Sequence, residues 1–207
     1  QFDWHVPDWV IIPGGNLGHV TALGKGFLEM HQMGMIDRLP GIAVGQAANA
    51  NPLYSSYLKG FESFDAMEAK DTLASAIRIG DPVSWERAIR VMRQFNGVVE
   101  EATENELADA CARADRTGLF TCPHTGVALA ALEKLLARRV ITPESRVVVI
   151  STAHGLKFPE VKVKYHQDQL QDFDVTPARA NHPLEVDADF DQVRGAVLGA
   201  LESAFAT

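Results

Sequence analysis

The chain has 207 residues, of which 46% are hydrophobic, and a formal net charge of −8. This is enough for one well-packed domain or most of one. The acidic balance argues against a nucleic-acid partner, because phosphates would be repelled. No apolar run has the length of a membrane span, and we expect no signal peptide. The two cysteines, Cys111 and Cys122, form neither a CxxC pair nor a disulfide framework, which favours a reducing, intracellular setting.

The first apolar run, residues 9–13, predicts a buried strand, and because domains rarely begin with a central strand we expect a piece of a longer polypeptide. Residues 41–46 predict a second strand, and residues around 51–59 a short helix. Between the two strands, apolar residues recur at helical spacing: Val20, Leu23, Phe27 and Met30.

In the middle of the chain, Asp81 and Pro82 predict a helix start, with Asp as the cap and Pro at the first helical position. Residues 97–102 predict a third strand. Thr103 and Glu106 then form a capping box, which predicts that a helix follows at once.

The last predicted units of the sheet are a helix from about Gly126 to Arg138 and a strand at 146–152. That strand is β-branched and uncharged after its first residue, as expected when both faces are covered. The alternation of strands and helices predicts an α/β fold with an open, mostly parallel sheet flanked by helices.

The chain after residue 167 has a different composition, so we expect two regions, 1–167 and a C-terminal extension at 168–207. Residues 168–191 are acidic and predict irregular structure. An amphipathic helix then follows, and its apolar stripe predicts packing in a core or an interface. The stripe comprises Phe190, Val193, Val197, Leu201 and Phe205.

The segment PGGNLGH at 13–19 joins the first strand to the first helix. Glycines allow backbone N–H groups to turn toward an anion, and a helix N-terminus favours negative charge. The spacing is neither GxGxxG nor a P-loop, so we expect a single phosphate group rather than a nucleotide tail. A tight strand-to-helix turn is the alternative.

Two more segments are candidates for the same pocket, because ligands of open α/β sheets bind at the carboxyl ends of strands. In STAHGLKF at 151–158, Thr152 offers a neutral hydroxyl to a heterocyclic nitrogen; an ordinary turn is the alternative. In SAIRIGDP at 75–82, Ser75 and Arg78 could line a pocket. The favoured interpretation is that Asp81 only caps the next helix and that Arg78 only forms an ion pair with Asp81. A zinc site at Cys122 and His124 lacks the usual ligand spacing, so we expect no metal.

Taken together, these segments resemble the threonine synthases, most closely their plant-type branch, which are pyridoxal-phosphate enzymes of fold type II. FDWHVPDWVIIPGGNLG, GQAANANPLY, SAIRIGDPVS, GVVEEAT, TCPHTGVALAAL and STAHGLKF occur in the family's order and spacing, from Phe2 to about His166. The resemblance implies that O-phospho-L-homoserine and water become L-threonine and phosphate, and that this chain is the C-terminal part of such an enzyme.

The resemblance also implies the roles of individual residues. Thr152 would hydrogen-bond the pyridine nitrogen of the cofactor, where a neutral hydroxyl leaves that nitrogen largely unprotonated. Asn16, Ser75 and Arg78 would bind substrate. The cofactor phosphate would be held by backbone N–H groups of Gly14, Gly15, Asn16, Leu17 and Gly18. His19 departs from the family, which commonly has Asn there.

One feature of the family has no counterpart in this sequence. The Schiff-base lysine of the family lies upstream, in a motif like Ser-Phe-Lys-Asp, and nothing here matches it. Lys157 follows the Thr152 segment but is not that lysine. We therefore expect no catalytic base in this chain, and expect the chain alone to be inactive.

The resemblance further implies a homodimer in the cytoplasm, or in the plastid if the source is a plant, with no nucleic-acid or membrane partner. Two alternatives remain open. One is another fold type II enzyme, a dehydratase or a cysteine synthase-like protein. The other is a non-catalytic fragment that binds phosphate or a partner, against which stands the apolar sheet edge that a half-fold would expose.

Overall fold

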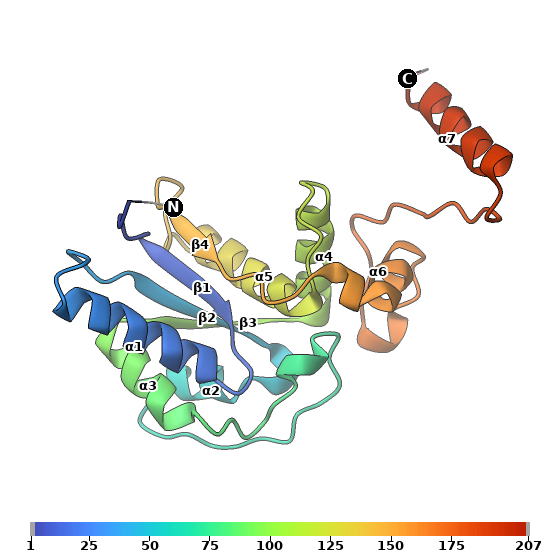
Figure 1. Cartoon of the computed structure of the whole chain (residues 1–207). Coiled ribbons are helices and arrows are strands. Elements are labelled where there is room, and N and C mark those ends of the chain that lie inside the picture. The colour runs from blue at the N-terminus through green and yellow to red at the C-terminus, as the bar shows by residue number, and fades with distance from the viewer. Residues whose placement is uncertain (1–2, 206–207) are drawn as a thin grey trace.

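The computed structural model describes residues 3–205; Phe2, where the family resemblance starts, lies outside them. Its centre is a four-stranded sheet in the order β3-β2-β1-β4, and every neighbouring pair is parallel (Figure 1). The predicted open parallel α/β fold is therefore confirmed. The strands are β1 (Trp9–Pro13), β2 (Gly41–Ala47), β3 (Val98–Ala102) and β4 (Val147–Val149).

Helices connect the strands and cover both faces of the sheet (Figure 1). Because parallel neighbours need crossover connections, each step from one strand to the next passes through at least one helix. The helices are α1 (Gly18–Gln32), α2 (Pro52–Leu58), α3 (Trp85–Gln94), α4 (Glu104–Asp115), α5 (Pro123–Ala137), α6 (Pro159–His166) and α7 (Phe190–Phe205). Short 3-10 turns include η2 (Ser75–Ile77) and η3 (Gly155–Lys157).

The alternation of side chains along β1 and β2 builds a core on each face of the sheet. Ile12 and Ile42 belong to a cluster with residues of α1 and α3, including Met92. Ile11 packs on the opposite face with residues of α5, including Leu135. Burial on both faces fixes the register of these central strands and so fixes where their carboxyl ends lie.

Two predicted helix starts are wrong. α3 begins at Trp85 rather than Pro82, because residues 82–85 form a turn in which the Trp85 N–H donates to the Pro82 carbonyl (3.2 Å). α5 begins at Pro123 rather than near Gly126, because the Cys122 sulfur accepts the Thr125 N–H (3.4 Å) and caps the helix. Cysteine is not among the usual capping residues, although Pro123 at the first helical position is a local signal of a helix start.

The capping box of α4 is confirmed: the Thr103 hydroxyl accepts the Glu106 N–H (3.2 Å), and the Glu106 carboxylate accepts the Thr103 N–H (2.8 Å).

The expectation that strand 146–152 is covered on both faces is wrong. β4 spans only Val147–Val149, and its three residues are half-buried, because the strand lies at the edge of the sheet beside β1.

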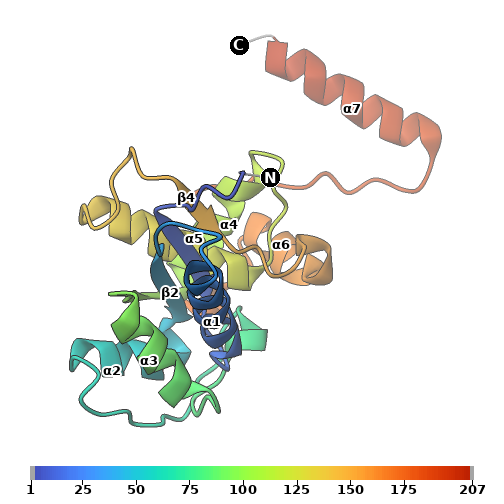
Figure 2. The same cartoon turned by 60° about the vertical axis from the view of Figure 1, so that its left-hand side comes forward.

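The C-terminal extension is irregular between α6 and α7, apart from one short 3-10 turn. Side chains of α4 and α6 hold its first part: Thr176 N–H donates to Asn105 (2.9 Å), and Arg179 N–H donates to the Tyr165 hydroxyl (3.2 Å). α7 then stands apart from the sheet in both views (Figures 1 and 2).

The sequence predicts that the apolar stripe of α7 packs in a core or an interface, and the structure rules out the core of this chain. Phe190 is 77% exposed and Val197 53% exposed. The Phe205 side chain lies outside the described part. Across residues 3–205, no helix is both long and apolar enough to cross a membrane.

The contact between α1 and α3 depends on a glycine. A Cβ on Gly24 would lie 2.4 Å from Val91 Cγ1, whereas a Cβ on Gly26, two residues along α1, would meet nothing within 4 Å. We expect Gly24→Ala to lower the free energy of unfolding by about 1–3 kcal/mol through overpacking. Gly26→Ala, the matched control, should raise it by up to ~1 kcal/mol through helix propensity. Urea unfolding measures both, and equal effects of the two changes would contradict this packing.

Candidate functional site

A cavity of about 540 Å³ opens at the carboxyl ends of β1 and β4. It lies where ligands bind in open parallel sheets. Its walls are the loop after β1 with the start of α1 (Pro13, Gly15–His19), the η2 segment (Ala76, Ile77, Ile79), and His124, Thr152, Ala153, Lys157 and Phe158. Four segments far apart in the sequence thus form one pocket, and both the glycine loop and Thr152 belong to it.

The loop after β1 leaves several backbone donors without acceptors. In residues 3–205, no acceptor is found for the N–H groups of residues 15–19, while the Thr21 N–H begins the helical pattern by donating to Leu17 O (3.2 Å). Leu17 adopts the left-handed conformation (φ 63°), which is costly for a residue with a side chain. This strained turn at a helix N-terminus is suited to an anion.

Gly14 differs from the residues that follow it. Its N–H donates to Gly45 O (2.7 Å), so this donor is not available to a phosphate. A Cβ on Gly14 would lie 2.5 Å from Val44 Cγ1. The expectation that Gly14 wraps the anion is therefore corrected: Gly14 lets the loop leave β1 close against β2.

Gly15 and Asn16 join the loop to the segment that faces it. A Cβ on Gly15 would lie 2.9 Å from Ile77 Cγ2, so only glycine allows this approach. Asn16 Oδ1 accepts the Val83 N–H (2.8 Å), which ties the loop to the turn before α3. The Asn16 amide N–H₂ group has no acceptor within residues 3–205 and remains a donor for a ligand.

Thr152 lines the cavity and is held by hydroxyl and thiol groups at the start of α5. Its N–H donates to Thr125 Oγ1 (3.3 Å), and its own Oγ1 lies 3.7 Å from Cys122 Sγ. Thr125 Oγ1 also lies 3.4 Å from Ser151 Oγ. The Thr152 backbone is therefore held by a neutral hydroxyl and its own hydroxyl lies beside a thiol, with no carboxylate among these contacts.

Ser75 and Arg78 flank the cavity without lining it. Arg78 forms an ion pair with Asp71, and its Nε donates to Ala69 O (3.4 Å). Ser75 is exposed. The residues between and beside them, Ala76, Ile77 and Ile79, form the wall instead.

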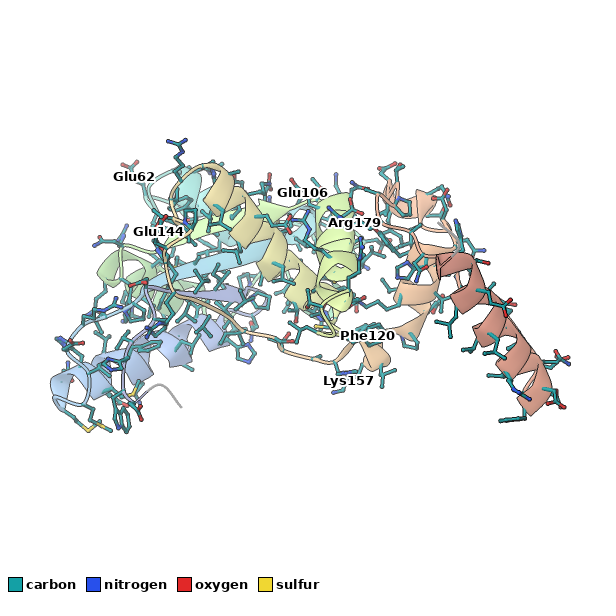
Figure 3. All side chains as sticks on the ribbon, turned by 90° about the horizontal axis from the view of Figure 1, so that it is seen from above. Glu62, Glu106, Phe120, Glu144, Lys157 and Arg179 are labelled. Carbon is teal, nitrogen blue, oxygen red and sulfur yellow. The ribbon has the colours of Figure 1, made fainter. Side chains whose placement is uncertain are left out.

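His124 is a wall residue whose contacts sequence reasoning did not identify. It is 3% exposed, its Nε2 accepts the Ala76 N–H (2.9 Å), and its ring stands edge-on to Phe158 at 5.0 Å between centroids. The segment PHTG at a helix start was its only sequence signal. Lys157, labelled in Figure 3, lines the same cavity from the η3 turn that follows β4.

Glu104 supports the same wall from α4. It is 7% exposed and its Oε2 accepts the Leu73 N–H (2.8 Å). Burial raises the pKa of the Glu104 carboxyl, although hydrogen bonds from Thr72 and from the Leu73 N–H act in the opposite direction.

Among the residues that the structure describes, no three His, Cys, Asp or Glu side chains are grouped as a metal ion requires.

Residues 1–153 match the family described as "Pyridoxal-phosphate dependent enzyme". The chain belongs to this family. It is 52% identical over 204 residues to threonine synthase 2, chloroplastic, of Arabidopsis thaliana, and 35% identical over 172 residues to threonine synthase of Methanocaldococcus jannaschii. These alignments cover 98% and 83% of this chain, but only 39% and 42% of the relatives, so the chain spans less than half their length.

Solved structures agree on the fold. A fungal L-serine ammonia-lyase from Rhizomucor miehei superposes with a TM-score of 0.62 at 21% identity, covering 78% of this chain and 51% of that one. Threonine synthase from Escherichia coli gives 0.59 at 19% identity, covering 97% and 45%. At these identities the likeness concerns the fold, which is the predicted fold type II.

The family's cofactor fits the cavity described above. The N–H groups of residues 15–19 lack acceptors in the described chain, as a site for a phosphate group requires. Gly15 keeps the space beside Ile77 open. On the opposite wall, the Thr152 hydroxyl offers a neutral hydrogen-bonding group to a ring nitrogen.

His124 should control the order of the η2 wall. We expect His124→Ala to speed hydrogen exchange at the Ala76 amide by about 10- to 100-fold, because this part-buried N–H loses its acceptor, and a lost hydrogen bond costs about 1–3 kcal/mol. His154→Ala is the control, since His154 accepts only the Leu156 N–H (3.2 Å) outside this wall. Exchange of Ala76 that is unchanged in His124→Ala would refute this role.

Proposed function

We propose that this chain is the C-terminal part of a threonine synthase, which converts O-phospho-L-homoserine and water into L-threonine and phosphate. The observation that carries the proposal is the pocket in which unpaired loop N–H groups face the Thr152 hydroxyl, in a chain 52% identical to a plant threonine synthase. The 35% identity to the archaeal enzyme supports the same activity.

In this proposal the loop holds the cofactor phosphate through the N–H groups of Gly15, Asn16, Leu17 and Gly18. Gly14 is left out, because its N–H is already donated to Gly45. Thr152 contacts the pyridine nitrogen. Pyridoxal phosphate, when bound, supplies the electron sink for the eliminations of the reaction, and the protein's part is to hold and orient it.

For the substrate phosphate, Asn16 is the donor that the geometry favours, since its amide N–H₂ group is free within the described residues. Arg78 is engaged with Asp71. A contact from Arg78 or Ser75 to substrate therefore requires the η2 segment to move toward the cavity. Such contacts act by electrostatic fit rather than by proton transfer.

The proton-transferring lysine of the reaction is proposed to come from the part of the enzyme that precedes this chain. Lys157 lines the cavity, but the resemblance implies that the lysine linked to the cofactor would be an upstream one. We propose residues 1–167 as the C-terminal part of the large cofactor-binding domain and 168–207 as an extension. We also propose a homodimer, in the plastid if the source is a plant, as the chloroplastic relative suggests, and otherwise in the cytoplasm.

The complete polypeptide with pyridoxal phosphate tests the activity. From O-phospho-L-homoserine, we expect L-threonine and inorganic phosphate in equal amounts. Because the fold is shared with an L-serine ammonia-lyase, L-serine, L-threonine and O-acetyl-L-serine should be offered in parallel. Ammonia and a keto acid from serine or threonine, without activity on the phosphate ester, would replace this proposal by a dehydratase; cysteine from O-acetylserine and sulfide would replace it by a cysteine synthase.

The glycine loop is tested in the complete polypeptide by Gly15→Ala. The added methyl would meet Ile77 at 2.9 Å and displace the loop, so the affinity for pyridoxal phosphate should fall at least about tenfold, which is ~1.4 kcal/mol. Gly26→Ala, on the same helix-loop unit but with open space around it, should bind as the unchanged protein does. Equal cofactor affinity in all three proteins would count against the loop.

A further inference from the structure

A second cavity, of about 640 Å³, lies between the C-terminal extension and the ends of α4 and α6. Its lining includes Arg116 from the end of α4, His166 from the end of α6 and residues 178–181 of the extension. Its lining residues differ from those of the cavity at the carboxyl ends of the strands. The proposed function therefore gives this second cavity no role.

The extension is held in place on both sides of Ala180. The Arg179 N–H donates to the Tyr165 hydroxyl (3.2 Å), and the Asn181 N–H donates to His166 Nδ1 (3.0 Å). The Ala180 N–H, which lies between them at the cavity, has no acceptor within residues 3–205. Two N–H groups thus fix the segment, and the third remains a donor for a ligand.

Two arginines line the cavity, Arg116 on α4 and Arg179 on the extension; Figure 3 labels Arg179. In residues 3–205, neither guanidinium group forms an ion pair or donates a hydrogen bond to the protein. Arg113, one turn earlier on α4, is different, because it pairs with Glu133 (2.9 Å). Arg179 is half-buried. A guanidinium group that loses part of its hydration in this way is stabilised when an acceptor takes its N–H groups.

The carboxylates near the cavity already have partners. Asp115 lines the cavity, but its Oδ2 accepts the ammonium group of Lys162 (2.6 Å). Burial raises the pKa of the Glu133 carboxyl, and the charges of Arg113 and Arg179 act against it, but its ion-pair partner is Arg113. The positive charge of Arg179 is therefore left for a group from outside the described chain.

The His166 ring adds a neutral donor. Because its Nδ1 accepts the Asn181 N–H (3.0 Å), the proton of the neutral ring is on Nε2. Burial lowers the pKa of His166 against the charge of Asp115, and the charges of Lys162 and His182 lower it further. Within residues 3–205 the Nε2–H group has no acceptor. The ring therefore leaves one more N–H group unpaired at the cavity wall.

We propose that this cavity binds a small oxyanion, carrying a phosphate or a carboxylate group, between the guanidinium groups of Arg116 and Arg179. The planar fork of a guanidinium group donates two N–H groups to two oxygens of such an anion. The Ala180 N–H is placed to add another donor. The bound anion joins the extension to the end of α4 and so stabilises the segment that forms its own site.

The charge of the chain narrows the class of ligand. The net charge is −8, so the cavity is a basic site on an acidic molecule. A polyanion such as a nucleic acid would meet the surrounding negative charge, whereas a small anion fits within the cavity. Phosphate and carboxylate groups present the same chemistry to the arginines, since both are ionised and accept hydrogen bonds.

The first test measures the affinity of the complete polypeptide, with pyridoxal phosphate bound, for inorganic phosphate and for succinate. Calorimetry at constant ionic strength keeps general screening unchanged. We expect saturable binding of at least one of the two probes. Binding of phosphate alone indicates a ligand with a phosphate group, and binding of succinate alone indicates a ligand with a carboxylate. If neither probe binds saturably, the proposal is overturned.

Variants of the arginines place the bound anion. Arg116→Gln and Arg179→Gln should each weaken binding about tenfold or more, because each removes a charged donor. Arg113→Gln is the matched control: it removes the same charge from α4, at a side chain that pairs with Glu133, and should bind as the unchanged protein does. Equal affinity in all four proteins, or an equal loss in Arg113→Gln, would overturn the proposal.

Circular dichroism of each variant shows whether the fold is intact. If Arg179→Gln does not fold, Arg116→Gln carries the test, because the Arg116 side chain is exposed.

Hydrogen exchange gives a local readout in the same protein. At saturation the anion should slow exchange of the Ala180 amide about tenfold or more, because this N–H gains an acceptor. An anion that slows exchange only at residues 13–19 would lie in the cavity at the strand ends, which would overturn the proposal. Formation of threonine is measured in the same preparations. Its absence removes the proposed function and leaves this anion site standing, so the two proposals fail separately.

Discussion

The constraint on which the site depends is the fate of the backbone N–H groups between β1 and α1. Burial on both faces fixes β1 in the sheet, and Gly14 continues its ladder by donating to Gly45. From Gly15 to His19 the N–H groups have no acceptor in the described chain. Unpaired donors are costly when buried, so this loop is stable only beside solvent or an anion. The pocket is therefore a consequence of how the strand ends.

The opposite wall is built from groups that reach across from α4 and α5. Glu104 holds the chain at Leu73, and His124 holds it at Ala76, so two side chains fix the η2 segment against the glycine loop. Thr125 accepts the Thr152 N–H, and the Cys122 sulfur lies beside the Thr152 hydroxyl. The start of α5 thus positions both the wall and the proposed ring contact, which links the packing of one helix to the chemistry of the pocket.

Most of the sheet could be predicted from the sequence, because central parallel strands are short apolar runs and the capping box at Thr103 is a local signal. That Gly15, Asn16 and Thr152 lie in one pocket could also be predicted, because the carboxyl ends of parallel strands meet at the same edge of the sheet. Long-range partners could not be predicted. No local sequence pattern shows that the Gly14 N–H donates to the Gly45 carbonyl, that Arg78 pairs with Asp71, or that a cysteine caps α5. The exposed stripe of α7 likewise has no sequence signature that separates it from a packed one.

The central claim is that this loop holds the phosphate of pyridoxal phosphate while Thr152 faces its ring. A crystal structure of the complete polypeptide with the cofactor bound tests it most directly. The account predicts phosphate oxygens within about 3 Å of the N–H groups of residues 15–18, with the ring nitrogen beside Thr152 Oγ1. A cofactor phosphate bound elsewhere, or a ring nitrogen paired with a carboxylate, would contradict it.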